Sequence, residues 1–101
     1  MHKRTRACQI PRKVKEKVWE RDGHRCVGCG RWVPVDCACA HYIARSHGGL
    51  GIEENVLTLC PVCHAEFDQS SNRRKLREIY GEYLKTRYGA NKSLVYRKGE
   101  T

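Results

Sequence analysis

Four cysteines stand in two short motifs whose spacing suits metal binding. Cys26-Val-Gly-Cys29 and Cys60-Pro-Val-Cys63 each have two residues between their cysteines, and the motifs lie 31 positions apart. Thiolates at this spacing supply the four soft donors of a closed tetrahedral Zn²⁺ site. A closed site has no position for a reacting water, so we expect a structural zinc. Zinc binding of this kind contributes about 10–16 kcal/mol at neutral pH, which a chain of 101 residues with a small core needs.

The three remaining cysteines leave other ligand sets open. An odd total of seven, together with the two C-x-x-C pairs, favours reduced thiols and a metal over disulfides. In a competing tetrad, Cys37 and Cys39 replace the second pair, which then stands in a turn without a metal. In another, His64 replaces one thiolate. Outside the zinc site, Cys8 and its two companions are expected to be small buried thiols.

Three polar residues between and after the two motifs have types that suit phosphodiester hydrolysis. His41, Asn55 and His64 are separated by 13 and then by 8 residues. Hydrolysis needs a base that deprotonates water and a cation that neutralises charge on the phosphate. A neutral histidine suits the base, since its pKa of about 6.5 lets it titrate near pH 6–7, and a second histidine suits a metal. Taken singly, His41 is also an ordinary core residue and Asn55 an ordinary turn residue.

Local patterns predict the elements that position these residues. Apolar residues recur at helical spacing after Pro11, and proline suits the start of a helix, so a helix is expected from there to Asp22. Strands are expected at 37–43 and 56–59, on either side of a glycine-rich loop. A short helix is expected at 64–69. A strand–strand–helix unit folded on the zinc would bring the three polar residues together.

A longer helix is expected after residue 70. Ser70 or Ser71 is the candidate cap, and Gly89 is the candidate end. The apolar stripe along this helix consists of Leu76, Ile79, Tyr80, Tyr83, Leu84 and Tyr88. We expect the stripe to pack against the first helix rather than to stack on nucleic acid. The segment 90–101 has no clear period and is expected to be a mobile tail.

Charge is distributed unevenly along the chain. The net charge is +6 over residues 1–21, −3 over 22–71 and +6 over 72–101, for a total of +9. Two basic arms favour a polyanionic partner such as nucleic acid, although a solvated basic face is an alternative. No apolar run approaches the roughly 20 residues that cross a bilayer, and no apolar stretch follows the basic N-terminus as in a signal peptide. We therefore expect a cytoplasmic, reducing environment and no membrane partner.

These segments together resemble the HNH endonuclease family. The residues that carry the resemblance are His41-Tyr-Ile-Ala-Arg-Ser-His-Gly-Gly49 and Glu54-Asn55-Val-Leu-Thr-Leu-Cys60-Pro-Val-Cys63-His64. The resemblance covers about residues 24–68. It implies a small α+β fold in a single domain over 1–101. In that fold, a zinc-stabilised ββα-metal finger is flanked by an N-terminal helix and a longer C-terminal helix.

The resemblance also implies an activity, that of a divalent-metal-dependent DNA endonuclease. His41 would be the general base that activates water, and Asn55 would hold the loop and the backbone of His41. His64 would bind a catalytic ion, Mg²⁺, Mn²⁺ or another divalent ion, separate from the zinc. The products would carry 5′-phosphate and 3′-hydroxyl ends, and double-stranded DNA is the expected substrate. Such a nuclease domain is typical of a phage, a mobile element or a restriction system.

Two positions depart from the family pattern. The family commonly has an aspartate metal ligand just before its first histidine and often a proline three residues after it, where this chain has Ala40 and Ala44. Because Ala40 cannot bind a metal, another residue must replace the ligand. The candidate is Asp68, which follows His64 by four positions and therefore shares its helix face.

The expected contacts with nucleic acid lie in the basic segments. The candidates are Arg45, Arg73, Arg74 and Lys75. Arg45 stands in the glycine loop, where it could clamp a phosphate. The alternative function is a non-catalytic zinc-finger module that binds nucleic acid, because a chain with Ala40 can keep its zinc while losing its catalytic ion.

Overall fold

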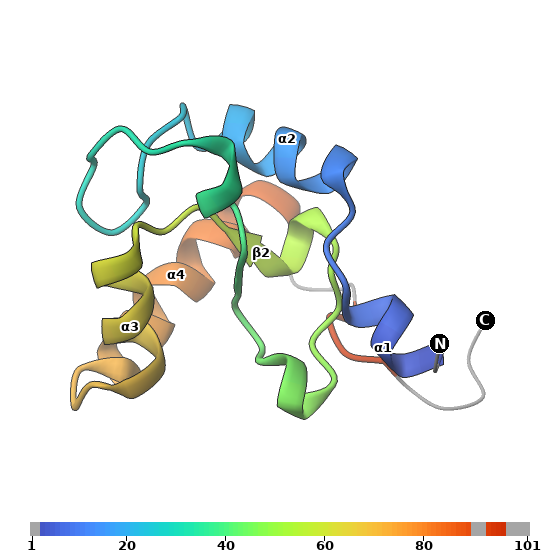
Figure 1. Cartoon of the computed structure of the whole chain (residues 1–101). Coiled ribbons are helices and arrows are strands. Elements are labelled where there is room, and N and C mark those ends of the chain that lie inside the picture. The colour runs from blue at the N-terminus through green and yellow to red at the C-terminus, as the bar shows by residue number, and fades with distance from the viewer. Residues whose placement is uncertain (1–2, 90–92, 97–101) are drawn as a thin grey trace.

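A two-stranded antiparallel sheet lies between the helices of this protein (Figure 1). The structure is a computed structural model and describes residues 3–89 and 93–96. The helices and strands are α1 (Lys3–Cys8), α2 (Arg12–Arg21), β1 (Ala40–His41), β2 (Val56–Leu57), α3 (Pro61–Gln69) and α4 (Arg73–Tyr88). Short 3₁₀ turns lie at Val35–Cys37, Arg45–His47 and Glu53–Asn55. The predicted small α+β fold is therefore confirmed.

The arrangement of the elements places the end of β1 between two helices. Ala40 pairs with Leu57 and His41 with Val56. In Figure 1, α1 and α3 lie on opposite sides of the strands, α2 lies above them, and α4 lies behind α3. Among the described residues, no helix has both the length and the apolar character to cross a membrane.

Helices α2 and α3 begin at prolines. Helix α2 follows Pro11 and ends at Asp22, as predicted. Helix α3 begins at Pro61, three residues earlier than predicted. The reason lies in the metal motif itself: the sulfur of Cys60 accepts a hydrogen bond from the amide of Cys63 and so caps the helix.

The start of α4 differs in detail from the prediction. The helix begins at Arg73, and neither Ser70 nor Ser71 provides a side-chain cap. Instead, the hydroxyl oxygen of Ser70 accepts a hydrogen bond from the amide nitrogen of Asn72 at 3.0 Å, which stabilises the turn before the helix. Gly89 ends the helix as predicted, in the left-handed region at a φ of 78°.

Both strands are shorter than predicted. Of the segment 37–43, only two residues pair, because Val35–Cys37 form a 3₁₀ turn. Of the segment 56–59, the ladder stops before Thr58, whose amide donates to a carboxylate oxygen of Asp22 at 3.0 Å. The register ends here because the next hydrogen-bonded pair, Ala38 with Leu59, does not form: the amide of Ala38 donates to the carbonyl of Val35 in the 3₁₀ turn, and the amide of Leu59 donates to the carbonyl of Cys37.

The apolar stripe of α4 packs mainly against α3. The prediction, by contrast, places it against the helix after Pro11, which is α2. Tyr80 and Leu84 are buried in one cluster with Phe67 of α3, and the rings of Phe67 and Tyr80 meet edge to face. Only a short turn joins the two helices, which makes them neighbours. Ile79 leaves the stripe and is 52% exposed, whereas the hydroxyl of Tyr83 reaches the end of α2.

The described part of the predicted mobile tail pairs with the glycine loop. The amide of Leu50 donates to the carbonyl of Leu94 at 2.8 Å, and the amide of Tyr96 donates to the carbonyl of Gly48 at 2.7 Å. These two hydrogen bonds fix residues 94–96 against the loop, contrary to the prediction for this part. The remainder of the predicted tail, 90–92 and 97–101, lies outside the described residues.

Candidate functional site

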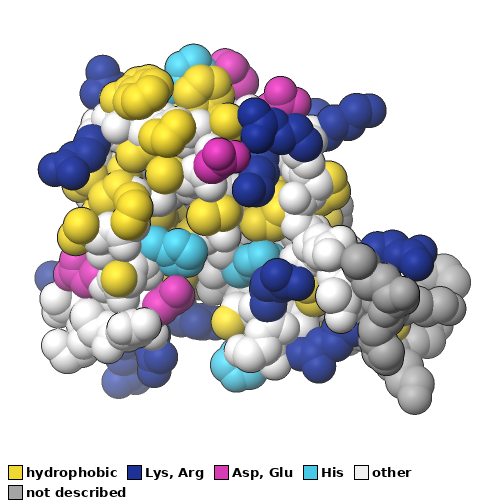
Figure 2. Space-filling view, viewed as in Figure 1, with side chains coloured by type: hydrophobic (Ala, Val, Ile, Leu, Met, Phe, Trp, Pro, Cys, Tyr) yellow, Lys and Arg dark blue, Asp and Glu magenta, His cyan; other side chains and the backbone are white. Residues whose placement is uncertain are grey.

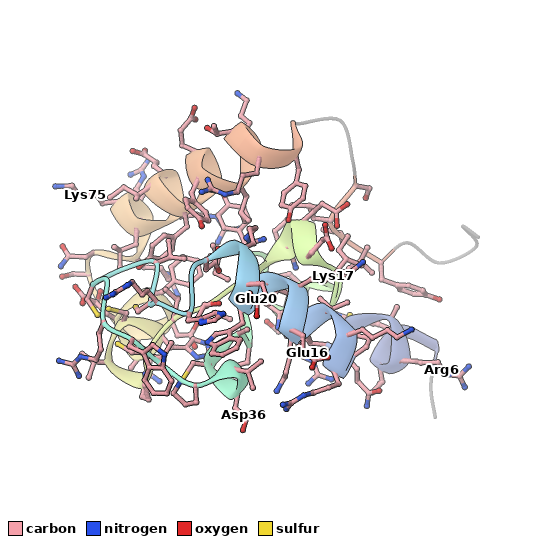
Figure 3. The ribbon with its side chains drawn as sticks, turned by 90° about the horizontal axis from the view of Figure 1, so that it is seen from above. Arg6, Glu16, Lys17, Glu20, Asp36 and Lys75 are labelled. Atoms are coloured by element: carbon pink, nitrogen blue, oxygen red, sulfur yellow. The ribbon has the colours of Figure 1, made fainter. Side chains whose placement is uncertain are left out.

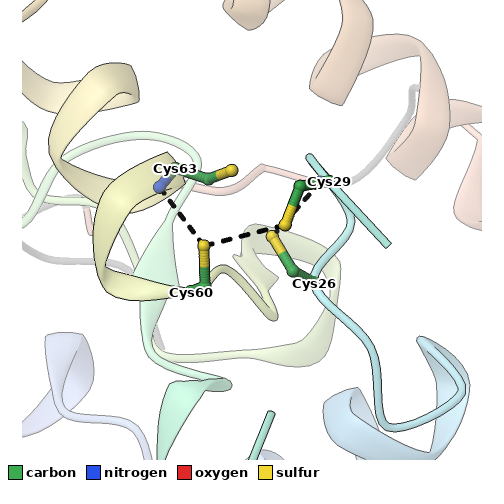
Figure 4. A group of neighbouring side chains, drawn as sticks. All are labelled: Cys26, Cys29, Cys60 and Cys63. Atoms are coloured by element: carbon green, nitrogen blue, oxygen red, sulfur yellow. Dashed lines mark hydrogen bonds between the residues drawn. The ribbon is translucent and has the colours of Figure 1, made fainter. Parts of the chain in front are cut away.

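The four cysteines of the two motifs gather in one cluster. The sulfur atoms of Cys26, Cys29, Cys60 and Cys63 all lie within 4.8 Å of one another (Figure 4). Two come from the turn after residue 25 and two from the start of α3. In each motif, the amide of the second cysteine donates to the sulfur of the first at 3.4 Å. The cluster expected from the spacing is present, and it could hold a metal such as zinc.

The electrostatics of the cluster favour a bound cation. The amide of Cys63 donates to the sulfur of Cys60 and lowers the pKa of that thiol to about 7. Burial, together with the neighbouring sulfur atoms, raises the pKa of Cys63. Four thiols this close cannot all ionise without a counter-charge, because each thiolate opposes the next. A divalent cation supplies that charge, which fits this donor set.

The alternative ligand sets do not form. Within the described ranges, no cluster of three or more metal-binding side chains includes Cys37, Cys39 or His64. Burial raises the pKa of both Cys37 and Cys39, so these half-buried residues stay as neutral thiols. Cys8 is a buried free thiol, as predicted.

His41 is half-buried at the end of β1, and its ring is fixed by the backbone of α1. Its Nε2 lies 2.8 Å from the carbonyl oxygen of Cys8. A carbonyl only accepts hydrogen bonds, so Nε2 carries the hydrogen and, in the neutral ring, Nδ1 keeps its lone pair. Burial lowers the pKa of His41, and the charges of Arg45 and His64 lower it further, against the opposing effect of the Cys8 carbonyl. The result is a neutral imidazole with a basic nitrogen.

Asn55 closes the loop that follows His41. Its side chain is fully buried. The amide oxygen accepts the backbone hydrogen of Ile43 at 2.9 Å, and the amide nitrogen donates to the carbonyls of Ile43 at 3.2 Å and Leu50 at 2.9 Å. One side chain thus joins the two ends of the glycine loop. It holds the residues around His41 rather than His41 itself.

We expect Asn55→Asp to lower the free energy of unfolding by about 3 kcal/mol or more. The change keeps the shape of the side chain but removes two donors and buries a negative charge against two carbonyl oxygens. Urea unfolding of the zinc-loaded protein measures the effect. Asn72→Asp is the matched control: Asn72 is exposed and its side-chain amide makes one hydrogen bond, to Glu66, so its change should lower stability by no more than about 1 kcal/mol. Equal losses in both variants would contradict the role of Asn55 in closing the loop.

His64 and Asp68 lie one helical turn apart on α3. The Nε2 of His64 is 3.4 Å from a carboxylate oxygen of Asp68. The charge of His64 contributes to the lowered pKa of His41 at the end of β1. Figure 2 shows two histidine side chains close together on this face, with Lys and Arg side chains nearby. Ala40 is 0% exposed and packs in the core, so it adds nothing to this surface.

His41 faces a groove with a volume of about 590 Å³. The groove lies between α1, the start of α2 and the Arg45–His47 turn. It is lined by Arg6, Gln9, Ile10, Pro11, Lys15, Cys39, His41 and Arg45. Of the four basic residues predicted to contact nucleic acid, Arg45 alone lines this groove.

Helix α1 forms one wall of the groove, and hydrogen bonds attach it to the glycine loop. Arg4 donates to the carbonyl of Ser46 at 2.9 Å, and the amide of Gly51 donates to the carbonyl of Ala7 at 3.0 Å. A side chain at Gly51 would collide with the carbonyl of Gln9, so this close approach requires glycine. No pattern in the sequence predicts this docking, since α1 has no apolar period.

The other predicted contacts lie away from the groove. Arg73, Arg74 and Lys75 are exposed at the start of α4. Arg73 donates to the carbonyl of Asp68 at 3.3 Å. Figure 3 shows Lys75 and Arg6 at opposite ends of the molecule. The structure therefore brings Arg45 together with His41 and places residues 73–75 elsewhere.

Comparisons with protein-family models, with curated proteins and with solved structures found no match for this chain. The function must therefore be inferred from the residues and their geometry.

Proposed function

We propose that this protein is a divalent-metal-dependent DNA endonuclease of the HNH type that its sequence resembles. The observation that carries the proposal is His41, a neutral histidine with a fixed tautomer that faces a cationic groove. In this proposal, β1, β2 and α3 form the ββα-metal finger, and the four-cysteine cluster holds a structural zinc. The seven free thiols favour a reducing compartment.

His41 acts as the general base. Its Nδ1 takes a proton from a water molecule, and the hydroxide attacks the phosphorus atom. The hydrogen bond from Nε2 to the carbonyl of Cys8 then stabilises the positive imidazolium. The bond from phosphorus to the 3′ oxygen breaks and that oxygen takes up a proton, which leaves 5′-phosphate and 3′-hydroxyl ends.

His64 and Asp68 are the candidate ligands of the catalytic ion. One imidazole nitrogen and one carboxylate oxygen, 3.4 Å apart, form a partial donor set. In Mg²⁺ and Mn²⁺ sites, water and substrate phosphate commonly fill the remaining coordination positions. When bound, such an ion would neutralise charge on the phosphate and on the leaving oxygen. Asp68 in this role replaces the ligand that Ala40 cannot provide.

Arg45 and Asn55 support the reaction in different ways. Arg45 lines the groove beside His41, so its guanidinium can contact a phosphate oxygen. Asn55 holds the loop that carries Arg45 and so keeps the groove in shape.

The pH dependence of DNA nicking tests the role of His41. Only neutral His41 accepts a proton, so the rate should rise with pH and level off above the pKa of this residue. Burial and the neighbouring charges lower that pKa, so we expect the midpoint of the rise to lie below the ordinary value of about 6.5. The rate of conversion of supercoiled to open-circular plasmid, measured from about pH 5 to pH 8, gives the profile. A rate independent of pH over this range would contradict general-base catalysis by His41.

A second candidate function is a zinc module that binds nucleic acid without cutting it. One observation favours it: in the part of the chain that the structure describes, His64 and Asp68 form a pair and not a cluster of three metal-binding side chains. Such a module would shift DNA on a gel in the absence of divalent ion and leave plasmid intact in its presence.

A further inference from the structure

The groove beside His41 differs in the charge of its lining from three other hollows of the surface. Its charged lining residues are Arg6, Lys15 and Arg45, and no acidic residue lines it. Three other hollows have volumes of about 460, 670 and 630 Å³, and each is lined by two or more glutamates. Within the described residues, no salt bridge holds any of the three basic side chains of the groove.

We propose that this groove binds the phosphodiester backbone of one nucleic-acid strand, with Arg6 and Lys15 contacting phosphates next to the one at His41. The inference rests on the proposed function and extends it, because it adds two contact residues outside the segment that resembles the HNH family. It also places the strand between α1 and the start of α2, whereas Lys75 lies at the opposite end of the molecule from Arg6 (Figure 3).

The positions of the basic side chains support a continuous path. Arg45 is close enough to His41 to lower its pKa, and the charge of Lys15 acts on Cys39, two residues before His41. Arg6 extends the lining onto α1. Three cations along one groove suit a repeating anion better than a single small anion. The volume of the groove lies within the usual range for ligand clefts, about 300–1,000 Å³, which suits one strand rather than a whole duplex.

The salt dependence of DNA binding reports the number of phosphate contacts. We would measure the Kd of a fluorescently labelled 20-base-pair duplex by anisotropy at about 50–200 mM salt, with zinc-loaded protein and no added divalent ion. Arg6→Gln and Lys15→Gln should each reduce the slope of log Kd against log salt by about 1, and the double variant by about 2. The increase in Kd between about 50 and 200 mM salt should therefore be about 3.5-fold smaller for a variant that lacks one contact than for the wild-type protein. Arg6→Lys should retain the wild-type slope, because it keeps the charge.

Matched controls remove the same charge elsewhere. Lys17 is on α2 like Lys15, but it lines a hollow with Glu16 and Glu20. Lys85 is on α4 and lines another hollow, with Glu78 and Glu82. Lys17→Gln and Lys85→Gln should leave the slope within about 0.3 of wild type. Equal slopes in groove and control variants would overturn the inference. A single-stranded probe should show the same order of variants, and an effect confined to duplex would overturn the one-strand assignment.

Failure of this inference can be told apart from failure of the proposed function. If the groove variants lower the slope but wild-type protein never nicks plasmid with Mg²⁺ or Mn²⁺, the groove binds nucleic acid and the nuclease proposal fails. If wild-type protein nicks plasmid and the groove variants bind like the controls, the nuclease proposal stands and the groove inference fails.

Discussion

Cys60→Ser should unfold the protein. Cys60 is 3% exposed, belongs to the four-cysteine cluster and caps α3, so its loss removes a proposed zinc ligand and a helix cap together. A serine hydroxyl is a poor substitute for a thiolate on zinc. The metal contributes about 10–16 kcal/mol in such sites, which equals or exceeds the whole stability of a typical small domain, about 5–15 kcal/mol. Circular dichroism, thermal melting and zinc content measure the effect.

Cys39→Ser is the matched control for this prediction. Cys39 is a half-buried thiol outside the cluster, so its variant should fold and keep one zinc per chain. Native circular dichroism and unchanged melting in Cys60→Ser would contradict the assignment of the zinc ligands. Loss of zinc in Cys39→Ser would instead favour the tetrad with Cys37 and Cys39.

His41→Ala should reduce DNA cleavage by about 10²–10⁴-fold while zinc content and fold stay unchanged. General-base catalysis by a positioned side chain typically provides a rate enhancement of this size. The side chain is half-buried and bonds to a single backbone carbonyl, so its removal disturbs little of the core. The rate of plasmid nicking at saturating divalent ion gives the comparison.

His47→Ala controls for the loss of a histidine near the glycine loop. His47 is exposed, and it does not line the groove of His41. Its variant should nick plasmid at the wild-type rate. Equal activity of the His41→Ala variant and the wild-type protein would contradict the general-base role of His41. Equal losses of activity in His41→Ala and His47→Ala would indicate an indirect effect through the loop.

Local signals in the sequence predicted the metal cluster and the main helices. Two C-x-x-C motifs specify a cluster by spacing alone, because each motif folds into a turn whose amide bonds to its own first sulfur. Proline and glycine marked the start of α2 and the end of α4 through their fixed backbone preferences. These features depend on neighbours in the chain, so a pattern can reveal them.

The contacts that shape the His41 site are long-range and involve backbone atoms. The carbonyl of Cys8 meets His41 across 33 positions, and a carbonyl has no sequence signature. Asp22 was predicted only to end a helix. Its fully buried carboxylate also accepts a hydrogen bond from the amide of Thr58 across 36 positions, which joins the end of α2 to the chain after β2. Neither contact could be predicted from periodicity or from motif spacing.

Cleavage of supercoiled plasmid tests the central claim most directly. Zinc-loaded wild-type protein would be incubated with plasmid, with and without added Mg²⁺ or Mn²⁺, beside the His41→Ala variant. Omitting the ion, rather than adding a chelator, leaves the structural zinc in place. We expect open-circular or linear product only with wild-type protein and a divalent ion. Intact plasmid under all conditions, with DNA still retarded on a gel, would contradict the nuclease proposal and favour a zinc module that only binds nucleic acid.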